Sequence, residues 1–219
     1  MSDKNAFSAG WYNQIIYLVS AHTLQQMPRD IGVEVAFAGR SNAGKSSVIN
    51  SITGKNSLAR ISKAPGRTRL LNFFEYREGI RLVDLPGYGY AKVPAEVKQH
   101  WIALLNGYFE ARVSLKGVML IMDIRHPLTR FDEQMLNLCQ ATDRPVHILL
   151  NKSDKLSRGA GMNTLKQVKT RLQPGCQSVQ LFSALKQTGV DEARSILGCW
   201  LGSPSADTEI TVLSPGVFT

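Results

Sequence analysis

The chain has 219 residues, of which 43% are hydrophobic and 20% charged, and its formal net charge is +9. This length and apolar content suffice for one well-buried domain, and the three scattered cysteines lack the paired spacing of a zinc site. The apolar run from Ile15 to Val19 is too short for a signal or membrane helix, so we expect a soluble, cytoplasmic protein with no membrane partner.

Strand-like and helix-like patterns alternate after residue 80, which is typical of a parallel sheet covered by helices. The patterns predict strands near 33–38, 70–76, 80–84, 117–123, 146–151 and 178–183, and helices near 45–53, 94–112, 129–141, 163–172 and 189–200. The short turn Arg77-Glu78-Gly79 joins two strands as a hairpin. We therefore expect an α/β fold with a mostly parallel six-stranded sheet, one antiparallel edge strand and helices on both faces.

One domain should span residues 26–202, after an N-terminal extension at residues 1–25. Residues 203–219 contain two Ser-Pro steps and no Lys or Arg, so we expect them to form a flexible tail.

The first predicted strand, Val33 to Ala38, leads into the pattern G-x-x-x-x-G-K-[ST], after which a helix is expected. The N–H groups of such a loop point at the α- and β-phosphates of a nucleotide, and the positive end of the helix dipole adds to the attraction. Lys45 can reach the β- and γ-phosphate oxygens, and the Ser46 hydroxyl can ligate Mg²⁺. We therefore predict a phosphate-binding loop made of Gly39, Arg40, Ser41, Asn42, Ala43, Gly44, Lys45 and Ser46.

A basic segment from Lys55 to Arg69 follows, with five basic residues and no acidic one. Pro65-Gly66 indicates a loop that can move, and Thr68 is a candidate second Mg²⁺ ligand that is ordered only when a γ-phosphate is present. A solvated basic loop would explain the charge but not the threonine. We interpret the segment as a switch that brings to the nucleotide site Gly66, Arg67, Thr68, Arg69 and Leu70.

The sequence Asp84-Leu85-Pro86-Gly87 follows the next predicted strand, at the edge of the sheet where ligands bind in open α/β folds. Asp84 can hold Mg²⁺ directly or through water, and the N–H of Gly87 can bond the γ-phosphate. A lone D-x-x-G is common in turns, but its order and spacing after Lys45 favour a nucleotide site.

The sequence Asn151-Lys152-Ser153-Asp154 follows the apolar strand 146–150 and predicts how the base is recognised. The carboxylate of Asp154 can accept hydrogen bonds from guanine N1–H and the exocyclic amine, whereas adenine has a donor at neither place. Lys152 can lie along the plane of the base, and Asn151 can tie this loop to the phosphate loop. A polar turn with exposed lysines is the alternative.

A fourth segment, Phe182-Ser183-Ala184, follows the last predicted strand and can offer the backbone N–H of Ala184 to guanine O6. Each segment alone is a weak signal, but all four occur in one order and each at the end of a predicted strand. Together they indicate GTP and GDP as ligands.

Several longer blocks of the sequence resemble EngB-type bacterial GTP-binding proteins, of the TrmE-Era-EngA-EngB-septin-like class of P-loop GTPases. The resemblance is carried by residues 37–47, 65–68, 72–74, 84–91 and 123–127, within a match over about residues 15–200. It implies a Ras-like P-loop G domain with Mg²⁺-dependent GTP binding and slow hydrolysis. It also implies a role in assembly of the large ribosomal subunit and a requirement for normal cell division and septation.

The residue after Gly87 is Tyr88, where many switch GTPases carry a glutamine that orients the attacking water. Two hypotheses follow: hydrolysis is slow until a partner supplies a group, or a K⁺ ion substitutes for the missing charge. Asn42 motivates the second, because it resembles a phosphate-loop asparagine that ligates K⁺ in related GTPases. The residues that we expect to act in hydrolysis are Lys45, Thr68, Gly87 and Asn42.

The net charge of +9 favours a polyanionic partner, and ribosomal RNA or its precursor particle fits this charge. A second basic group comprises Lys152, Lys155, Arg158, Lys166, Lys169 and Arg171. An alternative function is a protein-interaction module at the division site that acts through Tyr88-Gly89-Tyr90 or the tail. In either case we expect a monomer.

Overall fold

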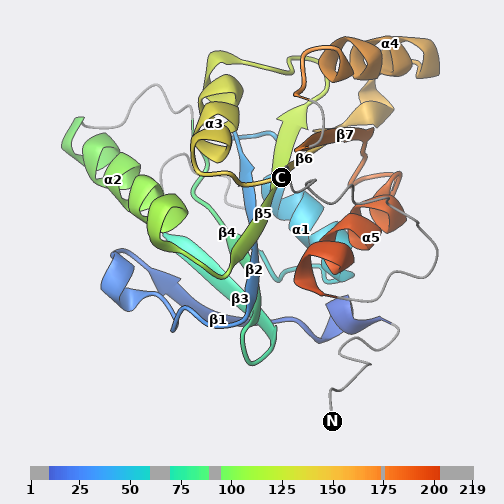
Figure 1. Ribbon diagram of the computed structural model, residues 1–219. Helices are drawn as coiled ribbons and strands as arrows, with labels where there is room; N and C mark the ends of the chain where they lie inside the picture. The colour runs from blue at the N-terminus through green and yellow to red at the C-terminus, as the bar shows by residue number, and fades with distance from the viewer. Residues whose placement is uncertain (1–9, 60–69, 89–94, 174–175, 203–219) are drawn as a thin grey trace, which may run out of the picture.

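The computed structural model describes residues 10–59, 70–88, 95–173 and 176–202 of the protein (Figure 1). At its centre lies a seven-stranded sheet with the strand order β1-β3-β4-β2-β5-β6-β7. The strands are β1 (Ile16–Ala21), β2 (Val33–Gly39), β3 (Leu71–Arg77), β4 (Ile80–Asp84), β5 (Leu115–Asp123), β6 (Val146–Asn151) and β7 (Gln177–Leu181).

Five α-helices connect or follow these strands: α1 (Lys45–Thr53), α2 (Ala95–Ala111), α3 (Arg130–Ala141), α4 (Arg158–Lys169) and α5 (Val190–Leu201). Three short 3₁₀ turns complete the described elements: η1 (Trp11–Gln14), η2 (Leu24–Gln26) and η3 (Ser153–Lys155). Helix α4 begins five residues earlier than we expected, because the side chain of Ser157 caps it by accepting a hydrogen bond from the Ala160 N–H.

The α/β fold class is confirmed, and the sheet gains one strand beyond the six that we expected. β3 pairs antiparallel with β4 as the predicted hairpin, while β2, β4, β5, β6 and β7 are parallel neighbours. The additional strand is β1, which pairs antiparallel with β3 and occupies the edge of the sheet. Part of the segment 1–25 is therefore integrated into the sheet.

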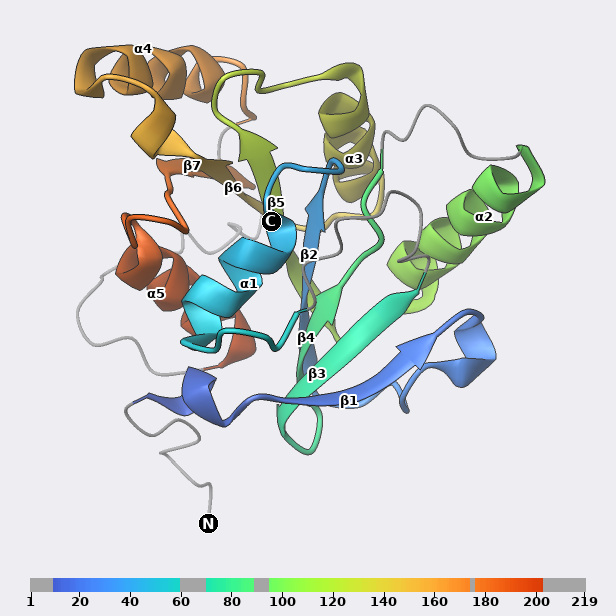
Figure 2. The ribbon, with the colours of Figure 1, turned by 180° about the vertical axis from the view of Figure 1, so that it is seen from behind.

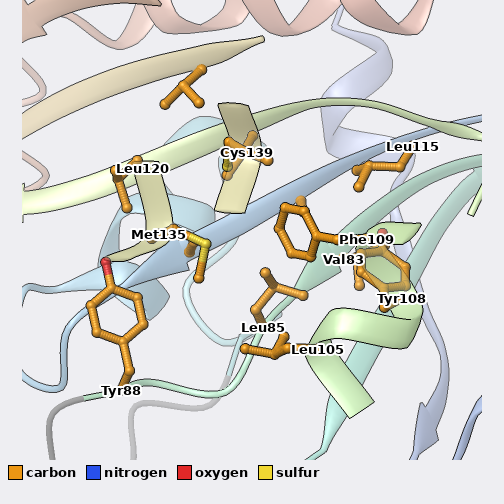
Figure 3. Close-up of a cluster of buried hydrophobic side chains, with 14 of the residues drawn as sticks. Val83, Leu85, Tyr88, Leu105, Tyr108, Phe109, Leu115, Leu120, Met135 and Cys139 are labelled. Atoms are coloured by element: carbon orange, nitrogen blue, oxygen red, sulfur yellow. The ribbon is translucent and has the colours of Figure 1, made fainter. Parts of the chain in front are cut away.

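Side chains of the central strands alternate between two hydrophobic clusters, one on each face of the sheet. On β2, Ala36 and Ala38 join the cluster covered by α2, α3 and α4, whereas Val35 and Phe37 join the cluster covered by α1 and α5. Figure 3 shows part of the first cluster, and the two opposite views show α3 on one face and α1 on the other (Figures 1 and 2). Because helices cover both faces, the central strands carry apolar residues on both sides.

A buried ionic cluster fixes the amino-terminal end of β2. The carboxylate of Glu34 accepts hydrogen bonds from Arg112 at 2.6 Å and from Arg81 at 3.2 Å, and also one from the Tyr108 hydroxyl at 3.2 Å. Its side chain is fully buried, and the ion pairs with the two arginines offset the cost of removing its charge from water. The cluster ties the end of α2 to the sheet and leaves the carboxyl ends of the strands free to carry polar loops.

Candidate functional site

The predicted phosphate loop joins β2 to α1 in a tight backbone turn. Asn42 and Gly44 have positive φ angles of 65° and 95°, and Lys45 begins the helix. A Cβ atom on Gly44 would collide with Nδ2 of Asn151, and one on Gly39 would lie 2.7 Å from the carbonyl oxygen of Ile121. Glycine is therefore required at both positions, and the first N–H groups of α1 are directed at the space beyond the loop.

The end of β4 brings Asp84 against this loop. The Lys45 ammonium forms an ion pair with the Asp84 carboxylate, and both side chains are almost fully buried. The backbone N–H of Leu85 donates to the Phe37 carbonyl at 3.0 Å, which holds the D-x-x-G segment beside β2. The arrangement places a carboxylate next to the first turn of α1, which carries Ser46.

The side chain of Tyr88 packs in the hydrophobic core (Figure 3). Its hydroxyl donates to Oδ1 of Asp132 at 3.0 Å, while its carbonyl accepts from the Ser41 N–H at 2.8 Å. Burial, with the negative charge of Asp132 as the next cause, raises the pKa of Tyr88 well above its usual value. The side chain that follows Gly87 is therefore a neutral core residue and is not directed at a nucleotide.

The predicted base-recognition segment begins at the end of β6 and contacts two of the other segments. Nδ2 of Asn151 donates to the Ala43 carbonyl at 2.8 Å, and its Oδ1 accepts from the Ala184 N–H at 3.3 Å. Nζ of Lys152 donates to the Asn42 carbonyl at 2.6 Å. Asn151 thus contacts the phosphate loop, as the sequence predicts, and also contacts the segment after β7, which we did not predict.

The carboxylate of Asp154 is oriented by its neighbours. The Ser183 hydroxyl donates to Oδ1 at 2.6 Å, and the Ser153 N–H donates to the Phe182 carbonyl at 3.0 Å. The hydrogen bond from Ser183 is the main cause that lowers the pKa of Asp154, against the opposing effect of desolvation. An ionised carboxylate with accepting oxygens is the group that can read the donor edge of guanine.

Our site prediction missed a carboxylate that contacts this segment, Asp123, and the arginine that binds this carboxylate, Arg125. Asp123, the last residue of β5, accepts a hydrogen bond from Nζ of Lys152 at 2.9 Å, and Arg125 binds the same carboxylate. The sequence block 123–127 could have indicated both residues, because it begins at the last residue of β5, a strand that pairs with β2 up to the phosphate loop.

Part of the predicted switch lies outside the described residues. This applies to Gly66, Arg67, Thr68 and Arg69, whereas Leu70 is described and lies half-buried before β3. Among the described residues, no group of three or more His, Cys, Asp or Glu side chains forms a metal cluster. None of the described helices is both long enough and apolar enough to cross a membrane.

Comparison with known proteins agrees with this geometry. Residues 34–152 match the family described as "50S ribosome-binding GTPase". The probable GTP-binding protein EngB of Methylococcus capsulatus is 55% identical over 201 residues, which cover 90% of this chain and 95% of that protein. The probable GTP-binding protein EngB of Stenotrophomonas maltophilia is 53% identical over 189 residues, which cover 85% of this chain and 94% of that protein.

Solved structures support the fold. A crystal structure of a probable GTP-binding protein engB has a TM-score of 0.63 at 21% identity, covering 78% of this chain and 99% of its own. Era of Aquifex aeolicus, bound to GDP and AlF4⁻, has a TM-score of 0.61 at 23% identity, covering 81% of this chain and 59% of its own. With a family match over more than half its length and relatives above 50% identity over most of it, the chain belongs to the EngB family of P-loop GTPases.

Proposed function

We propose that this GTPase is a nucleotide-dependent switch in assembly of the large ribosomal subunit, and that normal cell division and septation depend on it. The observation that carries the nucleotide site is the position of Asn151, whose amide contacts both Ala43 and Ala184. Through it, the phosphate-binding and base-binding segments form one continuous surface at the carboxyl ends of the parallel strands.

Each segment has a role in the proposed site. The N–H groups of residues 39–46 and the Lys45 ammonium bind the phosphates, so Lys45 exchanges the Asp84 carboxylate for phosphate oxygens when a nucleotide enters. Asp154 reads the donor edge of guanine, and the stem of Lys152 supports the face of the base. The Ala184 N–H, which donates to Asn151 in this structure, exchanges that acceptor for guanine O6 when the base enters. Gly87 offers its N–H to the γ-phosphate, and loss of that contact on hydrolysis releases the switch.

Mg²⁺ is the proposed cofactor, and two of its proposed oxygen ligands are described. Ser46 carries a hydroxyl on the first turn of α1 and Asp84 carries a carboxylate at the end of β4, while Thr68, the proposed second hydroxyl ligand, lies outside the described residues. Hydroxyl and carboxylate oxygens are the ligands that Mg²⁺ prefers, and the ion neutralises phosphate charge when bound.

Hydrolysis by this chain alone is proposed to be slow. The buried position of Tyr88 supports this, because no side chain at that place can orient the attacking water. The exposed Asn42, with its left-handed backbone, is the proposed ligand of a K⁺ ion that would supply positive charge beside the phosphates. Steady-state turnover in KCl and NaCl of equal ionic strength tests this, and equal rates would remove the K⁺ proposal.

The proposed ribosomal partner is supported by charge. Exposed basic residues occur in η3, along α4 and just beyond the helix, among them Arg158, Lys169 and Arg171. An exposed basic surface is drawn to RNA by counterion release, so its binding should weaken steeply with salt. The alternative, a protein contact through Tyr88-Gly89-Tyr90, is disfavoured at its first residue, because the Tyr88 ring is buried.

Co-sedimentation with purified large ribosomal subunits tests the proposal. GDP is compared with a non-hydrolysable GTP analogue at several salt concentrations, with Lys45→Ala as the nucleotide-binding control. Stronger, salt-sensitive binding with the analogue is expected. Binding that is indifferent to nucleotide, or absent, would contradict the switch and favour a protein partner.

A further inference from the structure

We infer that Asp123 is a positioning residue for the nucleotide base: its carboxylate, held in place by Arg125, orients Lys152 and thereby sets the affinity for guanine nucleotides. This inference rests on the proposed nucleotide site. It assigns a role to Asp123 and Arg125, two residues of the block 123–127 to which the proposed function gives none.

Asp123 lies in a rigid position beside the base-recognition segment. It is the last residue of β5 and pairs with Asn151 across the parallel β5–β6 ladder. The N–H of Ile124 donates to the Asn151 carbonyl at 3.0 Å, so the ladder continues one residue past Asp123. A side chain at this place therefore has a fixed origin relative to Asn151 and Lys152.

Arg125 fixes the direction of that side chain. Its guanidinium donates to Oδ1 of Asp123 at 2.9 Å and to Oδ2 at 2.7 Å, in a bidentate pair, and its backbone N–H donates to Oδ1 at 3.1 Å. The side chain of Asp123 is only 8% exposed, whereas that of Arg125 is 44% exposed. The arginine thus acts as an outer clamp on a buried carboxylate.

The clamped carboxylate leaves one oxygen directed at Lys152. Oδ2 of Asp123 accepts from Nζ of Lys152 at 2.9 Å, and the same ammonium donates to the Asn42 carbonyl of the phosphate loop at 2.6 Å. Lys152 itself has a left-handed backbone, with φ of 64°. A long lysine side chain loses much conformational freedom when it is ordered, so two fixed acceptors reduce the entropy cost that would otherwise fall on nucleotide binding.

Electrostatics favour the ionised form of the positioning group. The hydrogen bonds from Arg125 are the largest cause that holds the pKa of Asp123 well below its usual range; burial opposes them and the hydrogen bond from Lys152 adds to them. Asp154 contributes to the raised pKa of Arg125, after the hydrogen bond and charge of Asp123.

The test is a double-mutant cycle in GDP affinity with Asp123→Asn and Lys152→Met. Asparagine keeps the size of Asp123 but removes the charge, and methionine keeps an apolar stem without the ammonium. Asp123→Asn alone is expected to weaken GDP binding about tenfold, the scale of one charge-assisted hydrogen bond. In the Lys152→Met background the same change should have almost no further effect, because the group that Asp123 orients is already absent.

Asp30→Asn is the matched control. Asp30 also accepts backbone hydrogen bonds, from Val113 and Ser114, and lies near an arginine, Arg112, but it is at the opposite end of the sheet. It should leave GDP affinity unchanged. The inference would be overturned if Asp123→Asn bound GDP with wild-type affinity. It would also be overturned if Asp123→Asn lowered GDP affinity equally in the wild-type and Lys152→Met backgrounds. Failure of the wild-type chain to bind GDP would instead overturn the proposed site.

Discussion

The hydroxyl of Tyr88 donates a hydrogen bond to Asp132 at 3.0 Å, and this contact joins the D-x-x-G segment to helix α3. The other carboxylate oxygen of Asp132 accepts from the backbone N–H and the hydroxyl of Thr129, at 2.9 and 2.7 Å, and so caps α3. One carboxylate therefore caps the start of α3 and also accepts the hydrogen bond from Tyr88, the residue after Gly87.

Removing the Tyr88 hydroxyl should have two measurable effects, one on the stability of the fold and one on the preference for a GTP analogue over GDP. Tyr88→Phe keeps the ring in the core but loses the bond to Asp132, and we expect it to lower the free energy of unfolding by about 1 kcal/mol. Tyr108→Phe is the matched control, because its buried hydroxyl bonds Glu34 at the opposite end of the sheet. Urea unfolding measures both losses. Only Tyr88→Phe should change the ratio of GTP-analogue to GDP affinity; an equal ratio in the two variants would refute coupling through Tyr88.

Alanine should be harmful at Gly44, where it disturbs the nucleotide site, and stabilising at Gly159, where there is room for a methyl group. Gly44→Ala places a Cβ against Nδ2 of Asn151 at a φ of 95°, so it should lower GDP affinity at least tenfold, as measured by fluorescent-nucleotide titration. Gly159 lies in α4, and a Cβ added there would meet nothing within 4 Å, so Gly159→Ala should raise the free energy of unfolding by about 0.5–1 kcal/mol. GDP binding at wild-type strength by Gly44→Ala would contradict the steric account of the loop.

The ionic cluster at Glu34 should be important for stability and unimportant for nucleotide binding. Glu34→Gln removes the charge that Arg81 and Arg112 share, and we expect a loss of about 3 kcal/mol in the free energy of unfolding. Glu75 also pairs with Arg81 but is more exposed, so Glu75→Gln should cost about 1 kcal/mol or less. A comparable loss in the two variants, by urea unfolding, would show that burial of Glu34 is not what matters.

Acid should destabilise the fold through His147. Burial lowers the pKa of His147 below its usual 6.5, although the hydrogen bond to Gln180 opposes this. The unfolded chain therefore takes up a proton near pH 6.5, while the folded chain does so only at lower pH. The contribution of His147 is complete above pH 6.5 and is lost as the pH falls toward the folded pKa, by up to about 1.4 kcal/mol per pH unit.

Urea unfolding of the wild type and of His147→Gln between pH 7.5 and 5.5 measures this contribution. The variant lacks the titrating ring, so its stability should fall less steeply with acid. Parallel curves for the two proteins would exclude His147 as the cause.

The sequence predicted the parts of the molecule in which local residues determine the outcome. Phosphate-loop glycines and the segments after β4, β6 and β7 carry their chemistry within a few positions, so their arrangement could be anticipated from order alone. The extra strand β1 could not: it pairs with residues 71–75, far along the chain, and exposes Ile16 and Tyr17 on the sheet edge.

Long-range polar contacts were also beyond the sequence. Glu34 meets Arg112 across 78 positions, and Lys152 meets Asp123 across 29. The block 123–127 could have drawn attention to Asp123, but neither partner could be identified from a local pattern. We did not predict the early start of α4 because Gly159 and Gly161 lower helix propensity there. The cap at Ser157 compensates for this loss. The strand and the ion pairs depend on tertiary contacts, whereas the helix start depends on a local cap that outweighs propensity.

The central claim, that these segments bind a guanine nucleotide through Asp154, is tested most directly by exchanging the base. Asp154→Asn replaces the carboxylate that we propose to accept from guanine N1–H and the exocyclic amine. The new amide can instead donate to the carbonyl that xanthine carries in place of the amine. Titration with GDP and XDP should give a wild type that prefers GDP and a variant that prefers XDP. A variant that retains the wild-type affinity for GDP would contradict the account.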